Sequence, residues 1–175
     1  GETASAGSAS GKTGTPSAQT AGTAFNVTVN AVDANWNLVS SINTVGITST
    51  DVNATLPANA ALVGGTKTFS VTLKTAGSWT VTATNITDGT KTANTSPSIS
   101  VSAGAFAKMQ ILVPGETAAP GTASGKTGTP SAQTAGTAFN VTVNAVDANW
   151  NLISSTNTIG ITTTDPNDIT PSNAA

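Results

Sequence analysis

The chain has 175 residues, of which only 8% are charged, and its formal net charge at pH 7 is −2. It contains no Cys, His, Tyr or Arg, which excludes disulfides, Ser-His-Asp triads, Cys nucleophiles and His-ligated metals. We therefore predict no catalytic residues and no enzyme activity. The lack of clustered positive charge argues against a nucleic-acid partner, and no apolar run is long enough for membrane insertion.

An internal repeat organises the chain. Residues 9–38 recur without change as residues 123–152, 114 positions later, and residues 1–61 match residues 115–175 at 49 of 61 positions. Such a period is the signature of tandem structural units. We expect about one and a half 114-residue repeats. Residues 1–107 would form the first unit, with its first strand missing, and residues 108–175 the first half of the second.

Alternating apolar and polar residues predict a series of short strands. Residues 1–22 are loop-like, with a short edge strand near residues 16–20, and the clearest strand follows at residues 23–33. Further strands are expected at residues 38–41, 44–50, 67–73, 78–85, 98–102 and 108–113. No segment is long enough for a stable helix. The chain is therefore predicted to be all-β, because short strands separated by frequent turn signals are typical of sandwiches.

The motifs of the first unit also resemble a known family. AGTAFNVTVNAVDANWN, VGITSTD, ATLP, GGTKTFSVTLKTAG and SWTVTATN follow one another in this order. They are similar to the bacterial immunoglobulin-like repeats of large surface proteins, including invasin-like and intimin-like adhesins and their filamin-like relatives. The resemblance covers nearly the whole period and implies tandem immunoglobulin-like β-sandwiches, displayed as a rod at the cell surface or outside the cell. Trp36 and Trp150 depart from the pattern, since such repeats commonly have Gly there.

Two functions fit these observations. The first is a structural repeat of a bacterial surface fibre, stalk or matrix protein, which acts by end-to-end packing with neighbouring repeats or with identical chains in a filament. The alternative is an adhesin module that binds a glycan or a cell surface through exposed turn residues. Trp36 and Trp150 are the candidate contacts for a neighbour or ligand. Equally, each ring could fold back over its own sandwich.

The turn that carries each Trp has oxygen-bearing side chains at alternate positions. In the two copies these are Asp33, Asn35, Asn37, Asp147, Asn149 and Asn151. Such spacing resembles the start of a calcium loop, but the Gly and the terminal Glu of an EF-hand are absent. The alternative, which we favour, is a turn that Asp and Asn stabilise by bonding to the local backbone. No other cofactor is expected.

Overall fold

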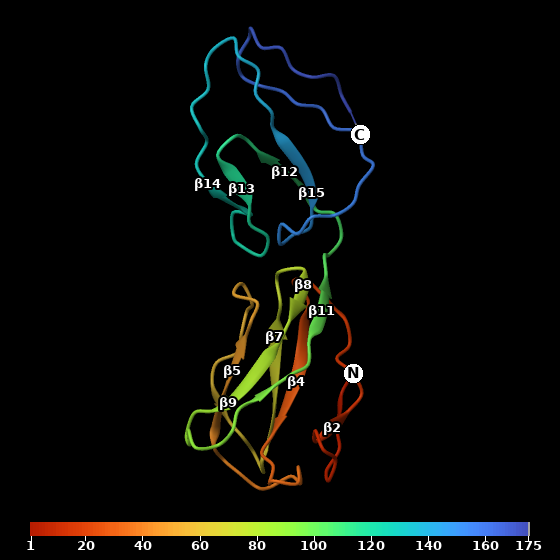
Figure 1. Cartoon of the computed structure of the whole chain (residues 1–175), viewed down its shortest axis with the longest axis vertical. Helices are drawn as coiled ribbons and strands as arrows, with labels where there is room; N and C mark the ends of the chain where they lie inside the picture. Colours follow the sequence, from red (N-terminus) through yellow and green to blue (C-terminus); the bar gives the residue numbers. More distant parts are fainter. Residues whose placement is uncertain (175) are drawn as a thin grey trace.

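The computed structural model describes residues 1–174 and is all-β, with no helix in that part of the chain. Figure 1 shows an elongated molecule in which two bodies follow one another along the long axis. The first unit holds β1 to β11 and the second holds β12 to β15, and the segment between β11 and β12 joins them. No helix in residues 1–174 is long and apolar enough to cross a membrane.

Eleven strands build the first unit, and most of them are short. They are β1 (Thr3–Ala4), β2 (Lys12–Thr13), β3 (Gln19–Thr20), β4 (Ala24–Asn30), β5 (Thr44–Ser49), β6 (Ala60–Ala61), β7 (Thr66–Thr72), β8 (Gly77–Trp79), β9 (Val81–Asn85), β10 (Asn94–Thr95) and β11 (Ile99–Ser102). β4 pairs with β7, β5 lies between β6 and β9, and β11 lies between β3 and β8. All pairings are antiparallel except that of β3 with β11.

The sheets of the first unit enclose one apolar core, as the alternation of the strand sequences requires. β7 shows the pattern most clearly, because Phe69, Val71 and the adjoining Leu73 are buried while Thr68 and Ser70 face solvent. The buried cluster comprises Ala21, Val45, Ile47, Leu62, Phe69, Val71, Leu73, Val81, Ile99 and Val101. Three sheets contribute strand residues to this cluster: β4–β7, β10–β9–β5–β6 and β3–β11–β8. The shared core therefore joins these three sheets into one unit.

Within residues 108–174, the second unit has four strands: β12 (Lys108–Leu112), β13 (Glu116–Ala118), β14 (Lys126–Gly128) and β15 (Thr142–Val146). β12 pairs with β15 and β13 pairs with β14, both antiparallel. The β13–β14 hairpin repeats the β1–β2 hairpin of the first unit. An ion pair closes each hairpin, Glu2–Lys12 at 3.2 Å and Glu116–Lys126 at 2.8 Å.

Three local predictions differ from the structure. Residues 38–41 form no strand, because Val39 N–H donates back to Ala31 and only an isolated bridge joins Val32 to Leu38. The stretch at residues 78–85 is interrupted at Thr80, since β8 pairs with β11 whereas β9 pairs with β5. The region expected to be loop before residue 16 contains the β1–β2 hairpin.

Candidate unit-to-unit junction

The turn after β4 and the turn after β15 have the same internal geometry. In the first turn (residues 33–37), Asp33 Oδ1 accepts hydrogen bonds from Asn35 N at 2.8 Å and Asn37 N at 2.9 Å. In the second turn (residues 147–151), Asp147 Oδ1 accepts the corresponding bonds at 2.8 and 2.9 Å. These are the local side-chain-to-backbone bonds by which Asp stabilises a tight turn.

The surroundings of the two turns are different. Asp33 and Asn37 are exposed at the free end of the first unit, whereas Asp147 and Asn151 are only 1% and 2% exposed. Because the two stretches are identical in sequence, the difference comes from what lies against them. The first unit covers the second turn.

Directional hydrogen bonds join the second turn to the first unit. Asn151 Oδ1 accepts from Ala76 N at 2.7 Å, and Asn151 Nδ2 donates to Lys74 O at 2.9 Å. Asp147 Oδ2 accepts from Gly104 N at 2.8 Å, just before the chain leaves the first unit. A side chain that both donates to and accepts from one backbone segment fixes orientation as well as distance.

Asp51 holds in place the segment of the first unit that contacts the second turn (residues 147–151). Its side chain is 2% exposed, and its Oδ2 accepts from Lys74 N at 2.8 Å and Thr75 N at 3.1 Å. Its Oδ1 accepts from Thr75 Oγ1 at 2.9 Å and Asn53 N at 3.0 Å. Asn53 then donates through Nδ2 to Pro120 O of the second unit at 3.2 Å. One buried carboxylate therefore holds the segment that presents Lys74 O and Ala76 N to Asn151.

Each Trp packs on its own unit, and Trp150 lies in the turn that makes the junction contacts. Both have a left-handed backbone, with φ of 65° at Trp36 and 68° at Trp150, a conformation that Gly adopts far more readily than a residue with a side chain. The Trp36 ring lies over Gly11, and the Trp150 ring lies over Gly125. Lys108 Nζ stands 3.5 Å from the centroid of the Trp150 ring, a cation–π contact within the second unit.

Hydrogen bonding lowers the pKa of both turn carboxylates. For Asp33, the bond from the Asn37 side chain is the largest cause of the lowered pKa. For Asp147, burial raises the pKa, but the bonds from Gly104, Asn151 and Asn149 together outweigh it, and the net pKa lies below the usual value of 3.8. Donors that stabilise the charged form have this effect.

These pKa shifts predict loss of stability in acid. A carboxylate whose pKa is lower in the folded than in the unfolded state stabilises the fold above the unfolded pKa of about 3.9. This contribution is lost as pH falls below about 4 and through the folded pKa. We expect the urea midpoint to hold between pH 5 and 7 and to drop below pH 4. Asp147→Asn is expected to flatten this drop, and an unchanged acid limb in that variant would contradict the assignment.

The calcium hypothesis is also open to direct measurement. The carboxylate oxygens of Asp33 and Asp147 accept N–H bonds, and residues 1–174 contain no group of three or more His, Cys, Asp or Glu side chains able to hold a metal. A bound cation would compete with these donors for the same carboxylate oxygens. We therefore expect the melting temperature to be the same in EDTA and in millimolar calcium. A rise with calcium, lost in Asp33→Ala, would instead establish a metal site.

Comparisons with known proteins give one match. No family model matches the chain, and no curated protein matches it. Among solved structures, domains 5–6 of the S-layer protein SbsC match over 89% of this chain and 77% of that chain, with 22% sequence identity and a TM-score of 0.39.

Sequence reasoning identified some junction residues and missed others. It singled out Asp147 and Asn151 as members of an oxygen-rich turn, with local backbone bonding favoured over calcium, but did not predict their contact with the neighbouring unit. It did not single out Asp51, although an Asp followed two residues later by Asn53 is typical of side-chain-to-backbone bonding in a turn. Lys74, Ala76 and Gly104 contribute backbone groups, and no sequence pattern marks such groups.

Proposed function

We propose that the chain is a structural repeat of a bacterial surface fibre, stalk or matrix protein, built from tandem immunoglobulin-like sandwiches. Its role is to set the distance and direction between successive units. The observation that carries the proposal is the docking of Asp147 and Asn151 onto Gly104, Ala76 and Lys74 of the preceding unit. The resemblance of the sequence motifs to bacterial surface repeats supports the extracellular location.

The junction suits a spacing role for a physical reason. A flexible linker would leave successive units free to rotate, whereas three side-chain-to-backbone bonds of 2.7 to 2.9 Å fix one relative orientation. The first turn carries the same side chains in the same local geometry, exposed at the opposite end of its unit. A unit with a docking turn at one end and a receiving segment at the other adds head to tail, so that each unit contacts mainly its two neighbours.

Small-angle X-ray scattering on extended chains tests this proposal. One or two further copies of residues 1–114 are placed before residue 1, and the maximum dimension is measured for each length. We expect an equal increment per added unit and cross-sections that stay constant. A maximum dimension that grows only as the square root of the number of units would indicate flexible beads and overturn the spacing role. Hits on a glycan array that disappear in Trp36→Ala would favour the adhesin alternative instead.

A further inference from the structure

The loop of the β13–β14 hairpin lies against the first unit. Thr122 N donates to Ala119 O at 3.4 Å, which closes a turn with Pro120 and Gly121 at its centre. Gly121 has a φ of 81°, as the third residue of a type II turn does, and Pro is favoured just before it. Pro120 O accepts from Asn53 Nδ2 of the first unit at 3.2 Å. The tip of this loop is therefore part of the junction.

Gly121 approaches the first unit so closely that a side chain has no room. A Cβ added to Gly121 would lie 2.9 Å from Asn53 Cβ and 2.7 Å from Asn53 Nδ2, and closer still to Thr75 Oγ1. Carbon atoms attract one another best at about 3.5–4.0 Å and repel at much shorter distances. A residue with a side chain at this position therefore forces either the two side chains or the two units to move apart.

Hydrogen bonds hold the two facing side chains in place. Thr75 Oγ1 donates to Asp51 Oδ1 at 2.9 Å and accepts from Asn53 Nδ2 at 3.2 Å. An amide nitrogen carries two hydrogens and a hydroxyl carries one, so the bonds to Thr75, Asp51 and Pro120 use all of these donors. Moving Thr75 aside would take a donor from the Asp51 carboxylate, which is 2% exposed. The first unit therefore resists the shift.

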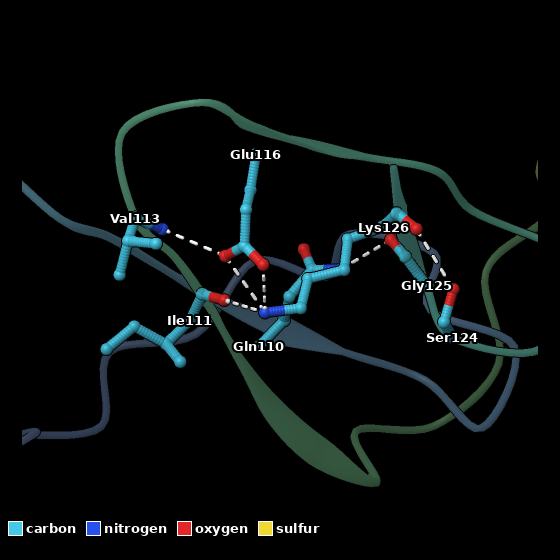
Figure 2. A network of polar contacts seen from close by, with 7 residues as sticks. All are labelled: Gln110, Ile111, Val113, Glu116, Ser124, Gly125 and Lys126. Atoms are coloured by element: carbon cyan, nitrogen blue, oxygen red, sulfur yellow. Dashed lines mark hydrogen bonds and ion pairs between the residues drawn. The ribbon is translucent and has the colours of Figure 1, made fainter. Parts of the chain in front are cut away.

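The hairpin is held to the rest of the second unit as well. Figure 2 shows the ion pair that closes it and the bond from Gln110 Nε2 of β12 to Gly125 O, at 2.7 Å. At the tip, Gly121 N donates to Asn149 O in the second turn at 2.7 Å. A displacement of the loop therefore displaces the second turn with it, and this turn makes the other junction bonds.

Gly7 stands at the corresponding place in the first unit and has the same local geometry. Its φ is 73°, and its N–H donates to Asn35 O at 2.7 Å. A Cβ added to Gly7 would meet no atom of residues 1–174 within 4 Å. Substitution therefore strains the backbone in the same way at both positions, and at Gly121 it also meets the first unit.

We propose that Gly121 and the pair of Asn53 and Thr75 determine which repeats dock as neighbours. The docking repeat carries Gly at the tip of its hairpin loop, and the receiving repeat presents Asn53 and Thr75 held by Asp51. A repeat with a side chain in place of Gly121 is rejected, because its turn cannot reach the backbone partners in the receiving unit. The inference rests on the proposed spacing role and adds which partner unit the junction accepts.

Substitutions at the two glycines test the proposal in the full chain. Spin labels at Ser70→Cys of β7 and Thr142→Cys of β15, both exposed and outside the hairpin, report the relative orientation of the units by double electron–electron resonance. We expect Gly121→Ala to lose the narrow distance distribution and Gly7→Ala to keep it. Gly121→Asn should lose it too, because Asn adopts positive φ more readily than most residues but still carries a Cβ.

The possible results separate this inference from the spacing role. A narrow distribution in both the parent and Gly121→Asn would overturn the inference and leave the spacing role intact. Loss in Gly121→Ala alone, or equal loss in Gly7→Ala, would assign the effect to backbone strain and overturn it as well. A broad distribution in the parent would contradict both. Urea unfolding confirms that the variants fold, and Gly121→Asn carries the test if Gly121→Ala does not.

Discussion

Replacing Asp51 by Ala is expected to lower the free energy of unfolding of the first unit by about 3–5 kcal/mol. The substitution removes the acceptor of Lys74 N, Thr75 N, Asn53 N and the Thr75 hydroxyl at a site that is 2% exposed. Each buried donor left without a partner costs about 1–3 kcal/mol. A domain of this size has about 5–15 kcal/mol of stability in total, so the loss is severe. Urea unfolding followed by Trp fluorescence measures it.

The repeat supplies a matched control for Asp51. Asp165 occupies the corresponding position in the second unit and is exposed, with Asn167 N as the donor to its carboxylate at 2.9 Å. Asp165→Ala should change the free energy of unfolding by about 0.5 kcal/mol or less, as exposed substitutions usually do. If Asp51→Ala prevents folding, Asp51→Asn retains one acceptor oxygen and gives a measurable intermediate loss. Equal effects at positions 51 and 165 would contradict the role of Asp51.

Replacing Asn151 by Ala is the second large effect we expect, a loss of about 2–3 kcal/mol from the second unit. The side chain accepts from Ala76 N and donates to Lys74 O, so its removal deletes two bonds across the junction and leaves two backbone groups without partners. It also deletes the bond within the turn from Asn151 Nδ2 to Asp147 Oδ2 at 2.9 Å. Thermal and urea unfolding of the full chain report the combined loss.

Asn37→Ala separates the two parts of this effect. Asn37 makes the same bond within its own turn, to Asp33 Oδ2 at 3.0 Å, but is exposed. Because residues 9–38 and 123–152 are identical, the difference in stability loss between Asn151→Ala and Asn37→Ala gives the contribution of the junction bonds. We expect Asn37→Ala to cost about 1 kcal/mol or less, as an exposed hydrogen bond does. Equal losses in the two variants would mean that the junction bonds contribute nothing to stability.

Whether a feature of the fold or of the junction could be predicted from the sequence depends on how far apart in the chain the interacting residues lie. β4 and β7 were predictable because Phe25, Val27 and Phe69 alternate with polar residues, and a period of two specifies one buried face. The tight turn at Asp33 was also predictable, since Asp and Asn bond to backbone only a few residues away. Both features depend on neighbours in sequence.

The junction depends on distant groups, so sequence could not reveal it. Asp33 and Asp147 sit in identical stretches, yet one is exposed and the other buried. The local sequence therefore does not distinguish the two Asp residues. The groups that bond to Asn151 are the backbone amide of Ala76 and the backbone carbonyl of Lys74. Every residue except Pro carries both kinds of group, so they leave no mark in the sequence. The β1–β2 hairpin was missed for a related reason, because its two-residue strands carry no alternation and the Glu2–Lys12 pair spans ten residues.

The most direct test of the account measures whether the two units hold one relative orientation. The chain has no Cys, so Ser70→Cys and Thr127→Cys place single spin labels on exposed strand positions of the first and second unit. Double electron–electron resonance then gives the distribution of distances between the labels. The account predicts one narrow distribution in the parent and in Asn37→Ala, and a broad one in Asn151→Ala. A distribution that is equally broad in all three proteins would contradict the claim that the docked turn fixes the rod.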